Sequence, residues 1–151
     1  MDSSEYTISQ IKKMDFLKDS NDEILNKIAQ EVIEIEFDKN EYILKEGRKG
    51  VYFFFLIDGT ISILEKDKND ELQQIASLTA PSYFGELALI YGTKRSATIK
   101  TETKVKAYSL SKESFDELIL KNDKIKENLL KSITASGRLK KVSLDLSKID
   151  L

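Results

Sequence analysis

One stretch of the sequence, residues 83–98, holds two charged residues and two glycines whose spacing could bind a nucleotide. The residues from Glu86 to Tyr91 favour a short helix after Gly85, and the start of a helix exposes backbone N–H groups that can receive a phosphate. Arg95 follows within a few residues, and its guanidinium can grip two phosphate oxygens. Glu86 would repel that phosphate unless it accepted a hydrogen bond from the same molecule, which a sugar hydroxyl can donate. Phosphate and sugar hydroxyl together indicate a nucleotide.

The same residues also have a structural explanation. Glu86 and Arg95 could form an ordinary ion pair at a loop, while the apolar residues of the stretch could fill the core: Phe84, Leu87, Leu89 and Ile90. A phosphate loop of the Walker type does not fit, because the order and spacing of glycine, threonine and lysine at 85–94 differ from that pattern. Composition and spacing therefore leave a nucleotide site and a structural ion pair both open.

The stretch from Phe84 to Thr98 resembles the phosphate-binding cassette of cyclic nucleotide-binding domains. The pattern of that cassette is Phe-Gly-Glu-Leu-Ala, a short helix, and then Pro-Arg-x-Ala-Thr. The regulatory subunits of cAMP-dependent protein kinase share the run Phe84 to Thr93, and the cGMP-dependent kinases are similar. The likeness covers about residues 11–135 and includes Glu46-Gly47, Gly50, Tyr52-Phe53, Asp58-Gly59 and Ser114-Phe115.

The resemblance implies a role for each matching residue. Glu86 matches the residue that accepts the ribose 2′-hydroxyl, and Arg95 matches the residue that holds the exocyclic phosphate oxygens. The other positions expected to bind the ligand, by lining the pocket or offering backbone N–H groups, are Phe84, Gly85, Leu87, Ala88, Ser96 and Ala97.

Two positions depart from the family pattern. Lys94 stands where proline usually precedes the arginine, which loosens the backbone without abolishing binding. Ser96 stands where the cAMP-dependent kinases have alanine and the cGMP-dependent kinases commonly have threonine. The cassette as a whole favours cAMP as the ligand, whereas a hydroxyl at Ser96 could bond the guanine amino group of cGMP.

The elements that position this stretch begin with a helix. Ser20 to Glu23 has the form of a capping box, and apolar residues then recur with helical spacing up to Val32. Period-two alternation and apolar runs predict strands at 33–37, 51–57, 60–65, 72–78, 97–101 and 105–110. Asp58-Gly59 predicts a two-residue hairpin turn between the second and third of these strands, and residues 67–70 predict another turn. We expect Gly47, Gly50 and Gly59 to form tight turns.

Helical spacing returns after Ser111. One helix is predicted around Phe115, Leu118 and Ile119, and a second around Ile125, Leu129 and Ile133. Asn122-Asp123 separates the two helices, and we expect the second helix to end at Gly137. Beyond it the alternating pattern leaves a strand, an extended tail and a docking segment all open.

The fold expected from this pattern and from the resemblance is mainly β with flanking helices. It is an eight-stranded β-roll, or jelly roll, with an N-terminal helical segment and C-terminal lid helices. We expect a single domain over residues 1–151, with its parts as follows: helical segment 1–32, β-roll 33–110 with the cassette at 84–97, C-terminal helices 111–137 and tail 138–151.

Composition excludes several classes of function. The sequence has no cysteine and no histidine, which removes disulfides, structural zinc sites, and mechanisms that need a thiolate or an imidazole. A metal-dependent oxygenase on a similar β-roll would also lack its histidine ligands. The net charge of −2 offers no strong field for a nucleic acid. No apolar run is long enough to span a bilayer, so we expect a cytoplasmic protein without membrane contact.

We therefore expect a sensor without catalytic activity, since no protein kinase signature is present. The resemblance implies that phosphate capture pulls the C-terminal helix over the base, and that the partner is a protein kinase catalytic subunit or domain. No aromatic residue follows Phe115, so the base would be covered by Leu129, Ile133 or Arg138, or from outside the chain. A cyclic nucleotide-gated channel domain is an alternative. A transcription regulator would need a helix-turn-helix, for which residues 132–151 are too short.

Overall fold

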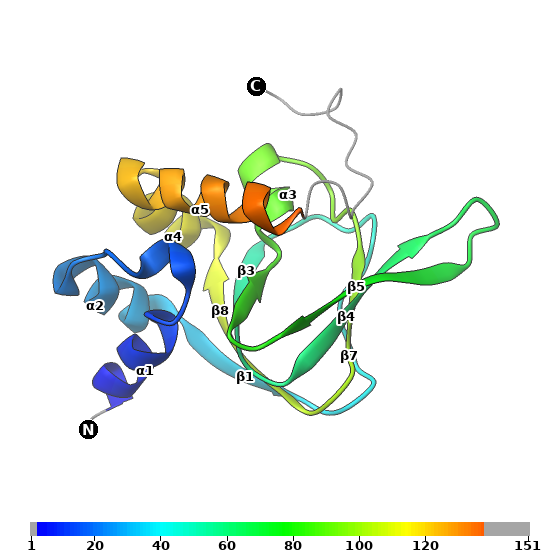
Figure 1. Cartoon of the computed structure of the whole chain (residues 1–151), viewed down its shortest axis with the longest axis horizontal. Helices are drawn as coiled ribbons and strands as arrows, with labels where there is room; N and C mark the ends of the chain where they lie inside the picture. Colours follow the sequence, from blue (N-terminus) through cyan, green and yellow to red (C-terminus); the bar gives the residue numbers. More distant parts are fainter. Residues whose placement is uncertain (1–2, 138–151) are drawn as a thin grey trace.

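The computed structural model describes residues 3–137, which form two antiparallel sheets with helices gathered at one side (Figure 1). One sheet has the strand order β1-β8-β3-β6 and the other β2-β7-β4-β5. The strand bounds are β1 Ile33–Phe37, β2 Tyr42–Leu44, β3 Tyr52–Asp58, β4 Thr60–Lys66, β5 Leu72–Thr79, β6 Ser82–Phe84, β7 Thr98–Thr101 and β8 Val105–Ser111. The expected fold, mainly β with flanking helices, is confirmed.

All six predicted strands are present within a residue or two of their expected bounds. The structure adds β2 and β6, which are three residues long and too short to show a period-two pattern. The turn predicted at residues 67–70 joins β4 to β5 as a hairpin. The Asp67 carboxylate stabilises this turn by accepting hydrogen bonds from the backbone N–H groups of Asn69 and Glu71.

The hairpin predicted at Asp58-Gly59 is wrong. β3 pairs with β8 and β6, whereas β4 pairs with β5 and β7, so the chain crosses here from one sheet to the other. A β-carbon at Gly59 would collide with the carbonyl oxygen of Lys104, and Gly59 has a φ of +96°. Four consecutive residues of β3 are buried, so both faces of this strand are covered: Phe53, Phe54, Phe55 and Leu56. Such a strand belongs inside a layered core rather than in an isolated hairpin.

Apart from α3 (Glu86–Tyr91), which lies between β6 and β7, the helices lie before β1 and after β8. Before β1 come α1 (Ser3–Ile11), the 3₁₀ turn η1 (Asp15–Leu17) and α2 (Asp22–Glu31). After β8 come α4 (Lys112–Phe115), the π-helical turn η2 (Asp116–Leu120) and α5 (Asp123–Ser136), as the sequence predicted. Gly137 ends α5 with a φ of +71°. The tail at 138–151 lies outside the described residues.

The predicted cap of α2 is displaced by one residue. Asn21 is the N-cap, and its side chain accepts a hydrogen bond from the backbone N–H of Ile24 at 3.0 Å. The Ser20 hydroxyl is buried and has no hydrogen-bond partner within the described residues. Asparagine caps helices as well as serine does, so two adjacent candidates could not be ranked by residue type alone.

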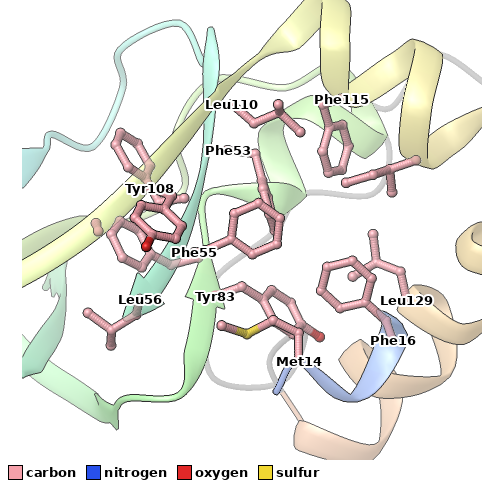
Figure 2. Packing of buried hydrophobic residues seen from close by; sticks show 14 of the residues in the cluster. Met14, Phe16, Phe53, Phe55, Leu56, Tyr83, Tyr108, Leu110, Phe115 and Leu129 are labelled. Atoms are coloured by element: carbon pink, nitrogen blue, oxygen red, sulfur yellow. The ribbon is translucent and has the colours of Figure 1, made fainter. Parts of the chain in front are cut away.

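The aromatic core joins the helices to the first sheet. Figure 2 shows Phe53, Phe55 and Tyr83 of this sheet packed against Phe16 of η1 and Phe115 of α4. Phe16 lies 5.0 Å from Tyr83, and Phe115 lies 4.9 Å from Phe53, measured between ring centroids. Leu129 and Ile133 of α5 are buried in the same core. This packing fixes α5 beside β6, the strand that leads into the cassette.

Candidate functional site

A cavity of about 510 Å³ lies between the cassette, the inner face of the second sheet and the end of α5. All eight residues predicted to bind ligand line this cavity: Phe84, Gly85, Glu86, Leu87, Ala88, Arg95, Ser96 and Ala97. The predicted helix is α3 (Glu86–Tyr91), which begins after Gly85 and ends before Gly92, both with positive φ. The structure therefore brings the charged and apolar residues of the cassette to one hollow.

Arg95 is nearly buried, with 6% of its surface exposed. Its Nη1 donates to the carbonyl oxygen of Gly85 at 2.7 Å, and its Nη2 donates to the carbonyl oxygen of Tyr52 at 2.7 Å. Burial lowers the pKa of Arg95, while the charge of Glu86 opposes this shift. An arginine remains charged in proteins, so the site holds an oriented cation whose other N–H groups can receive an anion.

Glu86 is the second buried charged residue of the cavity, with 2% of its surface exposed. It occupies the first turn of α3, where a negative charge is favoured by the helix dipole. Its charge acts on Arg95 across the site. A carboxylate has two oxygens with several acceptor positions, so Glu86 can accept a hydrogen bond from a ligand hydroxyl.

Two glycines make room for the Arg95 side chain. Gly85 has a φ of +87°, and a β-carbon there would lie 3.1 Å from Nη1 of Arg95. At Gly50 a β-carbon would lie 2.8 Å from Cβ of Ala88 and 3.1 Å from Cζ of Arg95. Gly47 and Gly59 have the positive φ of turns, but Gly50 does not. Close approach to Ala88 and Arg95, rather than a tight turn, is the reason for glycine at position 50.

The loop before β3 holds the backbone of Arg95 through two hydrogen bonds. The N–H of Arg95 donates to the carbonyl oxygen of Arg48 at 2.7 Å, and the N–H of Gly47 donates to the carbonyl oxygen of Arg95 at 2.8 Å. Lys94 forms an isolated antiparallel bridge with Lys49. Where the family pattern has proline, the chain therefore has a residue held by its pairing with a neighbouring loop.

The remaining walls were not identified from the sequence. The inner face of the second sheet contributes apolar side chains opposite the cassette, namely Leu44, Ile63, Ala76, Leu78 and Ile99. Ala76 and Leu78 lie two positions apart on β5, which is the spacing of side chains on one face of a strand, whereas β2, β4 and β7 contribute one residue each. The spacing of residues along a strand does not show that this face of the second sheet lies opposite the cassette, because that arrangement depends on how the two sheets pack together.

The end of α5 covers one side of the cavity through Ala135 and Ser136. Leu129 and Ile133, predicted to cover the base, are instead fully buried in the core and do not line the cavity. The helix α5 packs against η1 and η2, and its residues that line the cavity are Ser132, Ala135 and Ser136. Arg138, the other predicted covering residue, lies outside the described residues.

A polar network holds α5 near the cavity. The Ser132 hydroxyl lies 2.9 and 2.8 Å from the two carboxylate oxygens of Asp15, and 2.5 Å from the Tyr83 hydroxyl. These groups belong to α5, η1 and β6. The network thus connects the strand before the cassette to both helical segments.

Within residues 3–137 no group of three or more acidic side chains could hold a metal ion. No helix in the same range is long and apolar enough to cross a membrane. The cavity lining thus combines four charged residues, Lys13, Asp15, Glu86 and Arg95, with an apolar wall.

Comparison with known proteins agrees with this geometry. The family model for the cyclic nucleotide-binding domain matches residues 34–122. The chain is 32% identical over 122 residues to mouse cGMP-dependent protein kinase 2, covering 79% of this chain and 16% of the kinase. It is 30% identical over 115 residues to a cAMP-dependent protein kinase regulatory subunit of Mucor circinelloides f. lusitanicus, covering 76% of this chain and 26% of that subunit.

A solved structure has the same fold. The cAMP-bound fragment PfPKA-R (141–441) superposes with a TM-score of 0.79 at 30% identity, covering 98% of this chain and 50% of that one. This chain therefore spans half or less of each of these relatives. The family match extends over most of the β-roll, including the whole cassette, and the chain belongs to the cyclic nucleotide-binding domain family, of the type found in cAMP- and cGMP-dependent protein kinases.

Proposed function

We propose that the chain binds cAMP through the cassette and reports the nucleotide to a protein kinase. The observation that carries this proposal is the pair of buried charges, Arg95 and Glu86, in one cavity of about 510 Å³. In this proposal Arg95 bonds the exocyclic phosphate oxygens, and Glu86 accepts the ribose 2′-hydroxyl. Two hydrogen bonds to backbone carbonyl oxygens orient the Arg95 guanidinium before the ligand arrives, which reduces the entropy lost on binding.

The base has an apolar environment in this pose. Leu44, Ile63 and Leu78 of the second sheet offer a surface on which a purine can be buried, and Ala135 and Ser136 of α5 cover it. The aromatic residues that line the cavity, Tyr83 and Phe84, belong to β6, and neither the second sheet nor α5 contributes one. Aliphatic packing and the end of α5 take the place of a stacked ring.

The proposed signal is a change in the position or stability of α5. A ligand shifts a conformational equilibrium only as far as it binds one state better than the other. Contacts of the bound base with Ala135 and Ser136 would supply this difference, and the network through Ser132 would transmit it to η1. Hydrogen exchange along α5 with and without cAMP tests this step. Unchanged exchange at saturating cAMP would leave α5 without a role in the signal.

cGMP is the second candidate ligand because of Ser96. This residue lines the cavity and is partly exposed, so its hydroxyl can reach a bound base. Similarity to a cGMP-dependent protein kinase supports the same alternative. Replacing Ser96 with alanine separates the two ligands, because a hydroxyl that bonds the guanine amino group contributes to cGMP affinity and not to cAMP affinity.

A protein kinase catalytic subunit or domain is the proposed partner. The support comes from the names of the relatives, which are a kinase regulatory subunit and a cGMP-dependent kinase. The 34% identity to a mouse hyperpolarization-activated channel keeps an ion-channel context as an alternative. Co-purification of the full-length protein with a kinase activity that cAMP changes would separate the two.

Calorimetric titration of the chain with cAMP, cGMP, adenosine and guanosine tests the proposed function. We expect tight binding of cAMP, weaker binding of cGMP, and much weaker binding of the nucleosides, which lack the cyclic phosphate. Equal affinity for adenosine and cAMP would mean that Arg95 does not bind the phosphate of the ligand. Absence of binding by every nucleotide would refute the function while leaving the fold unchanged.

A further inference from the structure

A second hollow lies on the other side of Arg95, outside the nucleotide cavity. It has a volume of about 700 Å³, and we call it the outer groove. Its lining comes from β2, the loop that follows it and the start of β3, together with Arg95: Tyr42, Ile43, Leu44, Lys45, Arg48, Lys49, Val51, Tyr52, Phe54 and Arg95. This lining contains four cationic residues and no acidic residue. Apart from Leu44 and Arg95, no residue of this lining belongs to the nucleotide cavity.

Three cations of the outer groove, Lys45, Arg48 and Lys49, form no ion pair within the described residues. Six lysines of residues 3–137 form ion pairs with nearby carboxylates, and none of these six lines the groove. Lys45 and Lys100 instead lie over the Tyr42 ring, 5.8 and 5.1 Å from its centroid. Glu46 is in the same loop but does not line the groove, and its carboxylate accepts from the N–H of Lys66. An anionic partner would neutralise this patch on a chain whose net charge is −2.

The outer groove also exposes apolar side chains. Tyr42, Val51 and Tyr52 are each about half exposed, at 46%, 45% and 45%. They account for three of the six large hydrophobic residues that are exposed in residues 3–137. Clustered exposed apolar side chains mark interaction sites more often than scattered ones do. The groove thus joins apolar contact area to positive charge.

The backbone at the groove favours an extended peptide. β2 is one of the two edge strands of its sheet. Four consecutive residues, 42–45, line the groove although successive side chains of a strand point to opposite faces. The groove therefore runs along the strand edge, where main-chain groups can pair with an added strand.

We propose that the outer groove docks an extended acidic segment of a partner protein, in which carboxylate side chains alternate with apolar ones. The carboxylates meet Lys45, Arg48 and Lys49, and the apolar side chains cover Tyr52 and Val51. An added strand presents alternate residues to opposite faces, so alternation lets one segment satisfy both kinds of surface. A polyanion without apolar residues would leave the exposed aromatic surface uncovered.

The test measures fluorescence anisotropy of a labelled peptide, Glu-Val-Glu-Tyr-Glu-Val-Glu, titrated with the whole chain. Two comparison peptides have lysine in place of glutamate, or the same composition with all glutamates grouped at one end. The double variant Lys45→Glu with Lys49→Glu reverses the groove charge. Its control, Lys124→Glu with Lys126→Glu, makes the same change in net charge on exposed positions of α5. Thermal unfolding of both variants checks that each is folded.

We expect the alternating acidic peptide to bind the wild-type chain and the α5 control equally. Binding to the groove variant should be about 10-fold weaker or more, because two attractive contacts become repulsive. The lysine peptide should not bind, and the grouped peptide should bind more weakly. Equal weakening in both double variants would overturn the proposal, since only net charge would then matter. Binding of heparin or phosphatidylserine vesicles, but not of the peptide, would overturn it as well.

Discussion

The nucleotide cavity and the outer groove lie on opposite sides of Arg95, and their charges differ in contact with water. In the cavity, Arg95 and Glu86 are 6% and 2% exposed. Around the groove, Lys45, Arg48 and Lys49 are exposed. The cavity charges have lost most of their hydration before any ligand arrives, whereas the groove charges keep theirs.

This difference separates strong, directional binding from weak, additive binding. A buried charge that loses its partner suffers a large desolvation penalty, and its hydrogen bonds are stronger in a less polar surrounding. An exposed charge is screened by salt, and each of its contacts contributes little. Ligand affinity at the cavity should therefore fall steeply when a single residue is replaced. Ligand affinity at the groove should depend on the combined charge of several residues.

The largest effect is expected for Arg95→Ala. Removing this side chain should weaken cAMP binding about 30-fold or more, because truncating one partner of a buried charged contact costs roughly 2–5 kcal/mol. Calorimetry with cAMP measures the loss. Arg95→Lys is the matched control, since it keeps the charge without the planar fork and should recover only part of the affinity. Affinities of both variants near the wild-type value would remove the contrast between buried and exposed charges.

A smaller loss is expected for Glu86→Gln. A hydrogen bond to a charged group contributes about 1.5–3 kcal/mol, so cAMP affinity should fall roughly 10- to 150-fold. The decisive ligand is 2′-deoxy-cAMP, which lacks the proposed donor. Wild type should bind it weakly, and the substitution should add little further loss, because ligand and residue then lack the same contact. Additive losses would mean that Glu86 does not contact the 2′-hydroxyl.

Gly50→Ala tests whether space around Arg95 matters for binding. The added β-carbon would lie 2.8 Å from Cβ of Ala88 and 3.1 Å from Cζ of Arg95. Overpacking of this kind costs about 1–3 kcal/mol of folding stability, and the shifted guanidinium should also weaken cAMP binding. Asn40→Ala is the control, because Asn40 has a positive φ, of +66°, but lines neither the cavity nor the outer groove. The control should lose stability without losing affinity, and an equal loss of affinity in both would contradict the argument.

Ser132→Ala probes the network at the border of the cavity. The substitution removes the hydroxyl that lies between Asp15 and Tyr83, and should lower the free energy of unfolding by about 1–2 kcal/mol. Chemical denaturation measures this change. Tyr83→Phe removes a member of the same network, so the two losses should not add in the double variant. Full additivity would show that the three groups do not act as a unit.

The smallest effect is expected from salt, and it distinguishes the two sites most directly. Raising ionic strength from about 0.05 M to about 0.5 M should weaken acidic-peptide binding several-fold, because exposed charges are screened. The affinity for cAMP should change less than about twofold over the same range, because the cavity charges are buried. Parallel titrations of one preparation give both slopes. Equal salt dependence would mean that the two sites do not differ in hydration as the structure indicates.

Local patterns of residues were enough to predict the cassette. The glycines at 85 and 92 bound α3 as expected, and all eight predicted binding residues line one cavity. These residues lie within 14 consecutive positions, 84–97. A short segment brings its residues together through its own turns, so little of this arrangement waits for the rest of the chain.

Patterns that depend on distant partners were predicted less well. Asp58-Gly59 has the composition of a hairpin turn, yet the strands on either side belong to different sheets. The decisive contacts come from far along the chain, since Gly59 packs against Lys104 and its carbonyl accepts from the N–H of Ala80. Turn residues permit a reversal of the chain, but only the sheet partners decide which strands pair across it.

The covering of the cavity shows the same division. Helical spacing correctly placed Leu129 and Ile133 on the buried face of α5, but not which neighbour that face meets. The aromatic core around Phe16, Phe53 and Phe115 takes this face, which leaves Ala135 and Ser136 for the cavity. Packing of η1 and α4 against β3 therefore selects the residues that cover the cavity.

The sequence by itself determined the types of residue at the site, the helix and turns that carry them, and the family. Only the tertiary structure decided how the sheets close, which apolar wall faces the cassette, and that Arg95 separates the cavity from an outer cationic groove. The physical reason is the sequence distance over which each effect acts. Backbone propensities and hydrophobic periods act over a few residues, whereas burial of Arg95 depends on Tyr52 and Gly50, which are brought to it by strand pairing across the whole chain.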